Sequence, residues 1–161
     1  MTQTPPPDER PHVNHVLHDV DNTTPQELAA LFNEHGMRGA LAETMGIELL
    51  EVAADRTVGR MPVAGNTQPY GILHGGATVV LAETIGSIAA ATGAGPTQLS
   101  MGIEVSATHH RSPKGAYVTA TATPRHVGRT LATYIIDVVD EDGRRTATCI
   151  LTVAIRPLEQ R

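Results

Sequence analysis

A single acidic residue stands in the most apolar stretch of the sequence. Between Gly71 and Ser100, Glu83 is the only Asp, Glu, Lys or Arg, and most of its neighbours are alanine, glycine and branched aliphatic residues. An unpaired carboxylate that leaves water is costly and tends to take up a proton instead. A chain that keeps such a group has either a structural partner for it, such as a hydroxyl or a backbone amide, or a chemical use for it.

The residues His74, Gly75 and Gly76 precede this apolar run. Two adjacent glycines lower helix propensity by about 1 kcal/mol each, so they suit the mouth of a helix better than its interior. The N–H groups at a helix N-terminus favour negative charge. A carbonyl over the Gly75 N–H would therefore have its oxyanion stabilised during acyl transfer. For His74 alone, a hydrogen bond at the junction of loop and helix is the simpler interpretation.

The run from Gly75 to about Thr92 is apolar on nearly all sides, which predicts a helix that is buried over most of its surface. Glu83 and Ser87 are four residues apart and share one face of that helix. Glu83 follows Gly75 by eight residues, which is about 12 Å along the axis. Within one subunit, the two residues therefore cannot both lie about 3 Å from one substrate carbon.

Two arrangements are compatible with this spacing. Either Gly75 and Glu83 serve different sites, or antiparallel helices from two subunits bring Gly75 of one against Glu83 of the other. The second arrangement also covers a helix that is apolar all round, which one sheet cannot do alone. It predicts a dimer with two composite sites.

The remaining elements indicate an α+β fold with one short helix, two strands, the long helix and then four strands. Thr24-Pro25-Gln26-Glu27 has the pattern of a capping box with proline at the first helical position, and Gly36 suits the end of that helix. A strand pair is predicted around the turn at Asp55-Arg56. Four antiparallel strands separated by turn signals follow the long helix, over residues 99–111, 116–127, 130–140 and 144–156.

Length and composition restrict the class of protein. The 161 residues, 40% of them hydrophobic, fit one domain. A net charge of −5 and an aromatic content of 2% argue against binding to nucleic acid. Cys149 is the only cysteine, which excludes an internal disulfide and a cysteine-rich metal site. No metal site is expected.

Residues 1–22 are polar and rich in proline, and they lack the apolar segment of a secretory signal. They predict a disordered tail, with the domain proper over residues 23–161. The glycine and alanine content of the long apolar run, with Glu83 at its centre, argues against a membrane span. We therefore expect a cytoplasmic protein without a membrane partner.

The stretch "QPYGILHGGATVVLAETIGSIA" resembles the signature of hotdog-fold acyl-CoA thioesterases, in the PaaI-like branch that acts on aromatic acyl groups. Within the branch, the likeness is closest to the thioesterases of 1,4-dihydroxy-2-naphthoyl-CoA and of enterobactin proofreading. It extends over about residues 36–155 and includes "MPV", "GIEVSATHHRS" and "DEDGR". The resemblance implies a single hotdog domain, in which a curved antiparallel sheet wraps one long helix.

The family has a Gln six residues before the motif His, an acid nine residues after it, and a Ser or Thr four residues after the acid. Gln68, His74, Glu83 and Ser87 match these positions. The resemblance implies that Glu83 is the nucleophile or general base and that the Gly75 N–H polarises the thioester carbonyl. It further implies that Gln68 and His74 position the thioester, that Ser87 helps to hold water, and that the partner subunit supplies half of each site.

The resemblance also suggests residues that bind substrate. His109 would line the acyl pocket or assist water, and Ile88 would shape acyl specificity. Arg111 would bind the phosphates of coenzyme A. The alternative is that Arg111 is an ordinary charged residue on the surface of the strand. Tyr70 and Gly76 complete this group of candidates. The family positions of Ser106 and Thr108 normally hold asparagine, which leaves the shape of the acyl pocket open.

We therefore expect an acyl-CoA thioesterase for an aryl or medium-size acyl group, assembled as a homotetramer of dimers. Coenzyme A enters as part of the substrate, no further cofactor is expected, and a carrier-protein thioester is an alternative handle. Two other functions stay open: a non-catalytic acyl-CoA binding module, and a hotdog enoyl-thioester hydratase, whose prolines around the histidine are absent here. Further cations that could meet the phosphates, or that could simply be solvated, are Lys114, Arg125 and Arg129.

Overall fold

A computed structural model describes Leu17 and residues 22–158. The predicted tail, residues 1–22, therefore lies almost wholly outside the described residues. Of its length only Leu17 and Asn22 are described, and the Leu17 side chain is 5% exposed and belongs to the hydrophobic core.

The helix α2 (Pro25–Glu34) begins at the predicted capping box. Thr24 Oγ1 accepts a hydrogen bond from the Glu27 N–H at 3.3 Å, and the Glu27 carboxylate accepts one from the Thr24 N–H at 2.8 Å. The helix ends at Glu34, with His35 as its C-cap, just before Gly36. The side chains that it buries are Leu28, Ala29 and Phe32.

The five-residue helix α3 (Ala40–Thr44) was missing from the predicted order of elements. It follows Gly39 without a side-chain cap, and it is too short to show a helical period of apolar residues. The sequence therefore carries little local signal for it.

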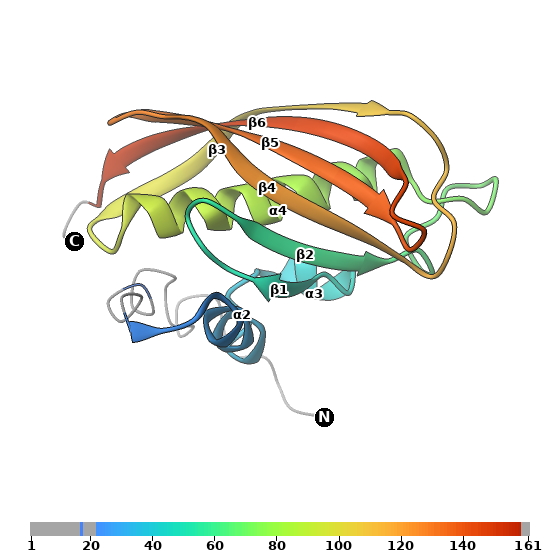
Figure 1. Ribbon diagram of the computed structural model, residues 1–161, viewed down its shortest axis with the longest axis horizontal. Coiled ribbons are helices and arrows are strands. Elements are labelled where there is room, and N and C mark those ends of the chain that lie inside the picture. Colours follow the sequence, from blue (N-terminus) through green and yellow to red (C-terminus); the bar gives the residue numbers. More distant parts are fainter. Residues whose placement is uncertain (1–16, 18–21, 159–161) are drawn as a thin grey trace.

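Six strands form one antiparallel sheet, in the order β1-β2-β4-β5-β6-β3. The sheet is twisted and curved, and α4 lies along its concave side (Figure 1). All six predicted strands are present, and the last four begin and end within two residues of the predicted positions. Their bounds are Glu48–Glu51 (β1), Thr57–Pro62 (β2), Gln98–His109 (β3), Tyr117–Val127 (β4), Leu131–Asp140 (β5) and Arg145–Pro157 (β6).

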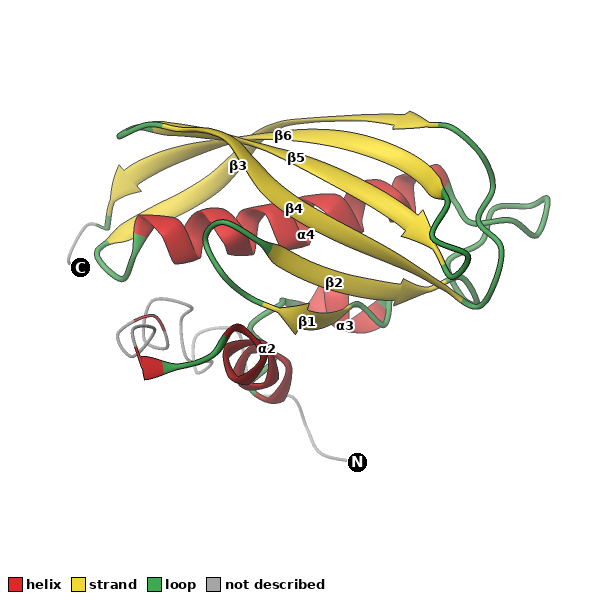
Figure 2. Cartoon of the chain, viewed as in Figure 1, coloured by secondary structure: helices red, strands yellow, loops and turns green. Residues whose placement is uncertain are grey.

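The long helix α4 (Gly75–Ala94) packs across the sheet as the centre of the core (Figure 2). Its length and composition would suffice to cross a membrane, but half of its most apolar stretch is buried inside the molecule, as in the core helix of a globular fold. The fold is the predicted hotdog arrangement. The side chains that α4 buries include Ala77, Leu81, Ala82, Ile85, Ile88 and Ala89.

Burial of α4 on nearly all sides is not found in the single chain. Glu83 is exposed, and Thr84 and Ser87 on the same side of the helix are only partly buried. The sheet wraps around one side of the helix and leaves the other side open. The sheet of one chain therefore covers only part of the apolar surface of α4.

Candidate active site

A cavity of about 410 Å³ lies at the N-terminus of α4. Its walls come from the loop before α4, the end of β3, the connection from β3 to β4, and the start of β6. The lining includes four of the predicted catalytic and substrate-binding residues, namely Gln68, Gly75, His109 and Arg111, and further residues that were not predicted from the sequence. These lining residues are Gln68, Ile72, Leu73, Gly75, Thr78, His109, His110, Arg111, Ser112, Pro113, Thr146 and Ala147.

Asn66 fixes the loop that carries Gln68 and His74. Its side-chain amide donates to the carbonyl oxygens of Met45 and Pro62 at 2.9 Å, and its own carbonyl accepts from the His74 N–H at 2.9 Å. The loop thereby joins the end of β2 to the beginning of α4. These bonds hold Gln68 half-buried at the cavity wall. The role of Asn66 was not predicted from the sequence.

His74 is the N-cap of α4. Its Nδ1 accepts a hydrogen bond from the Gly76 N–H at 2.8 Å, so the proton of the neutral ring lies on Nε2. This is the hydrogen bond expected at a junction of loop and helix, and it leaves Nε2 for another partner. The Gly76 N–H is therefore occupied, whereas the Gly75 N–H meets no acceptor within the described part of the chain.

Gly75 and His109 meet at the cavity wall. A Cβ atom on Gly75 would lie 2.9 Å from Nε2 of His109, which is closer than real side chains approach. Glycine at this position thus lets the imidazole reach the N-terminus of α4. An unused backbone N–H and an imidazole now face a single cavity, an arrangement suited to a polarised carbonyl and its attacking or leaving group.

Glu83 lies outside this cavity, about 12 Å along α4 from Gly75. Its carboxylate rests against Gly102 on β3, where a Cβ atom would lie 3.1 Å from Oε1 of Glu83. The register of β3 against β6 shifts just after Gly102. Ser87, one turn further along α4, is half-buried and is likewise absent from the cavity wall.

The other substrate-binding candidates are dispersed. Ile88 is 6% exposed and packs into the core, while Tyr70 is 87% exposed on the loop before α4. Arg111 is exposed at the cavity wall, with Lys114 three residues further along the same connection.

Arg125 and Arg129 lie near the far end of β4, whose eleven residues extend about 35 Å from the cavity end of the sheet. One bound nucleotide therefore cannot meet Lys114 and these two arginines within a single chain.

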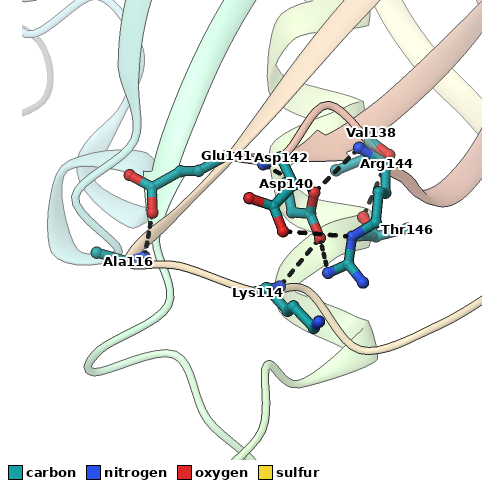
Figure 3. A network of polar contacts seen from close by, with 8 residues as sticks. All are labelled: Lys114, Ala116, Val138, Asp140, Glu141, Asp142, Arg144 and Thr146. Atoms are coloured by element: carbon teal, nitrogen blue, oxygen red, sulfur yellow. Dashed lines mark hydrogen bonds and ion pairs between the residues drawn. The ribbon is translucent and has the colours of Figure 1, made fainter.

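The hairpin between β5 and β6 supports the connection from β3 to β4, which sequence reasoning did not foresee (Figure 3). Asp140 accepts hydrogen bonds from the backbone N–H groups of Lys114, Asp142 and Arg144, and it pairs with the Arg144 guanidinium. Burial opposes the charge of Asp140, but these hydrogen bonds outweigh burial and hold its pKa well below the ordinary value. An Asp at the start of a turn, before Gly143, is the available signal in the sequence.

The described residues contain no group of three or more His, Cys, Asp or Glu side chains that could hold a metal ion. Burial and the charge of Asp137 raise the pKa of the Cys149 thiol to about 11, so this buried cysteine is not a nucleophile at neutral pH. The chemistry available at the cavity is that of imidazole, the side-chain amide of Gln68 and the backbone amide of Gly75.

Known proteins that resemble this chain in sequence or in fold include thioesterases. Residues 70–147 match the model of the thioesterase superfamily. The proofreading thioesterase EntH of Cronobacter turicensis is 41% identical over 118 residues, which span 73% of this chain and 86% of the relative. A thioesterase structure from Haemophilus influenzae aligns with a TM-score of 0.76 at 31% identity, and it covers 87% of this chain and 95% of the other.

A protein of Staphylococcus aureus, described as a thioesterase enzyme, has structures with a glutamine or a glutamate replaced by alanine. The glutamate variant aligns with a TM-score of 0.67 at 32% identity and covers 73% of this chain and 98% of the other. The chain belongs to the thioesterase superfamily and is a thioester hydrolase with the hotdog fold.

Proposed function

We propose that this enzyme hydrolyses acyl-CoA thioesters of aryl or medium-size acids at a site shared by two subunits. The observation that carries the proposal is the separation of the reacting groups. Gln68, Gly75 and His109 line a cavity to which the described residues contribute no carboxylate, while Glu83 is exposed about 12 Å further along the helix that begins at Gly75. A second copy that presents its Glu83 to this cavity would complete the site.

The exposed surface of the chain supports such a dimer. β3 is an edge strand of twelve residues, and it exposes Leu99, Met101 and Ile103. A long apolar edge is a template for pairing with another chain. Two β3 strands paired antiparallel about a twofold axis would also bring the open sides of the two α4 helices together. In the proposed assembly, two such dimers form a tetramer.

The reaction then follows from the groups at the composite site. Gln68 and His74 hold the thioester with its carbonyl oxygen on the Gly75 N–H, which stabilises the developing oxyanion. Glu83 of the other subunit acts as nucleophile or as general base for water, and Ser87 helps to hold that water. The carbonyl carbon gains an oxygen, the C–S bond breaks, and the products are the free acid and the coenzyme A thiol.

The relatives lend support to the choice of Gln68 and Glu83. In the Staphylococcus aureus protein, the substituted glutamine and glutamate are fifteen residues apart, which is also the separation of Gln68 and Glu83. The same pair of residue types at the same spacing is expected if both act on the substrate.

Coenzyme A is the handle that the surface near the cavity favours. Arg111 lines the cavity and Lys114 lies on the same connection, and neither takes part in the ion pairs of the described residues. Unpaired cations beside a ligand site suit phosphate groups. We assign these two side chains to the phosphates of the nucleotide.

Release of free thiol from a panel of acyl-CoAs tests the proposal. The panel contains benzoyl, hydroxybenzoyl, dihydroxynaphthoyl, phenylacetyl, hexanoyl and palmitoyl thioesters, with Glu83→Ala beside the wild type. We expect turnover of an aryl or medium-size member and a loss of about 10³-fold or more in the variant. Glu34→Ala, which removes an exposed acid at the end of α2, serves as the control and retains activity.

Three results would contradict the proposal. Bound but intact acyl-CoA would indicate a binding module, and a mass gain of one water without thiol release would indicate a hydratase. Equal activity of Glu83→Ala and the wild type would remove Glu83 from the mechanism.

A further inference from the structure

The connection between β3 and β4, residues 110–116, has no secondary structure of its own but is held in place at both ends. On the cavity side, the N–H of His110 donates to the Thr146 carbonyl at 2.7 Å. The Thr146 hydroxyl, which is buried, donates to the Val138 carbonyl at 3.2 Å. The first half of the connection is thereby attached to β6.

Asp140 holds the middle of the connection. Its Oδ2 accepts from the Lys114 N–H at 3.0 Å, and its side chain is wholly buried. The other acceptor positions of this carboxylate are filled by the hairpin itself, since Oδ1 accepts from the N–H groups of Asp142 at 3.2 Å and of Arg144 at 3.0 Å. Asp140 therefore joins the hairpin and the backbone of Lys114 into one network (Figure 3).

Glu141 holds the end of the connection. Its Oε2 accepts from the Ala116 N–H at 2.6 Å. The contact needs glycine at position 115, because the φ of Gly115 is +94° and a Cβ atom there would collide with the Glu141 carboxylate. Unlike Asp140, Glu141 is exposed to solvent, so a bond to one backbone amide is its evident structural task.

We propose that Asp140 and Glu141 are positioning residues, which fix the connection 110–116 so that Arg111 and Lys114 receive the phosphates of the thioester handle. This inference rests on the proposed function, and specifically on coenzyme A as the handle. Asp140 and Glu141 do not touch the substrate themselves. By holding the connection in place, they control the affinity for the nucleotide half of the substrate. The reacting end of the site, at Gly75 and Glu83, is untouched by it.

Steady-state kinetics on two substrates with one acyl group test this inference. The acyl group that the wild type hydrolyses fastest is presented on coenzyme A and on N-acetylcysteamine, a thiol without phosphates. In Glu141→Ala we expect KM for the acyl-CoA to rise about tenfold, with kcat within twofold of wild type. KM for the N-acetylcysteamine thioester stays unchanged, because that substrate has no phosphate groups for Arg111 and Lys114 to bind.

Two matched variants separate position from charge. Glu141→Gln keeps an oxygen that accepts from the Ala116 N–H, and we expect it to restore the wild-type KM. Asp142→Ala removes an acid from the same hairpin that bonds to no residue of the connection, and it too should leave KM unchanged. Gly115→Ala, which displaces Glu141 from the other side, should reproduce the effect of Glu141→Ala.

An unchanged KM for acyl-CoA in Glu141→Ala would overturn the inference, as would an equal rise for both substrates. Equal effects of Glu141→Ala and Asp142→Ala would also overturn it, since charge alone would then be responsible. Failure of the proposed function has a different signature, because the wild type itself would release no thiol from either substrate.

Discussion

At the scale of single residues, the site depends on how closely small groups approach one another. The Glu83 carboxylate lies against Gly102, and the His109 ring lies against Gly75. Both glycines leave room for a side chain from another element. A methyl group at either position would move a reacting or binding group without removing it.

Gly102→Ala is expected to lower kcat by about 10- to 100-fold, because a Cβ atom at position 102 would lie 3.1 Å from Oε1 of Glu83 and displace the carboxylate. Thiol release measures the rate, and urea unfolding should show that stability is nearly unchanged. Gln26→Ala, which changes an exposed residue of α2, is the control. Full activity of Gly102→Ala would mean that the observed position of the carboxylate is irrelevant to catalysis.

Cys149 is expected to be inert in the native enzyme, because burial raises its pKa to about 11 and keeps reagents away. An aromatic disulfide reagent at about pH 8 should detect no thiol in the folded chain and one thiol per chain after denaturation. Rapid labelling of the native protein would contradict the burial of Cys149. Thiol-release assays also depend on this result, because a thiol reagent that labelled Cys149 would add to the signal from coenzyme A.

The spacing of Gly75 and Glu83 was predictable from the sequence, whereas the surroundings of Glu83 were not. Residue numbers and helix geometry give the distance of about 12 Å. The curvature of the whole sheet determines which side of α4 stays exposed. The apolar composition of the helix gives no information about that side. Glu83 therefore looked buried in the sequence but is exposed in the single chain.

At the scale of elements, local signals decided which parts of the fold could be predicted. The capping box at Thr24 and the turn signals between the last strands mark their elements well. The helix α3 has no side-chain cap, and the attachment of residues 110–116 to the β5–β6 hairpin joins segments about 25 residues apart in the sequence. Such non-local hydrogen bonds leave no periodic pattern.

The capping box of α2 is a direct test at this scale. Thr24→Ala removes the oxygen that accepts from the Glu27 N–H, and we expect the free energy of unfolding to fall by about 1 kcal/mol. Urea unfolding measures the change, with Gln26→Ala, an exposed neighbour in the first turn, as the control. An unchanged unfolding midpoint would show that tertiary packing alone holds α2.

The hairpin network predicts a loss of stability in acid. The pKa of Asp140 is lower in the folded chain than its ordinary value near 4, so the ionised carboxylate stabilises the fold above that value. This contribution is lost as the pH falls from about 4 toward the lower pKa of the folded state. The urea midpoint of Asp140→Asn should therefore lie below that of the wild type at pH 7, and the gap should narrow in acid.

A gap that stays constant from pH 7 down to the acid range would contradict this account, because the charge of Asp140 would then not contribute. Asp142→Asn, in the same turn but with a side chain that is 63% exposed, should show little gap at any pH.

At the scale of the whole molecule, the exposed edge and the open side of α4 predict an oligomer. Light scattering should give two or four times the chain mass of 17.0 kDa. Ile103→Lys places a charge on the exposed β3 edge, and we expect it to shift the enzyme toward monomers and to lower kcat by 10²-fold or more. Val127→Lys, at an exposed position at the end of β4, is the control, because β5 and β6 separate β4 from β3. A fully active monomer would contradict the composite site.

Subunit complementation tests the central claim most directly. Glu83→Ala and Gln68→Ala chains, each nearly inactive alone, are mixed in equal amounts, unfolded and refolded together. If each site takes Glu83 from one subunit and Gln68 from the other, half of the dimers are hybrids with one intact site of two. The mixture should therefore recover about a quarter of wild-type thiol release. No recovery above the separately refolded variants, with hybrids shown to form, would mean that each site is built within a single chain.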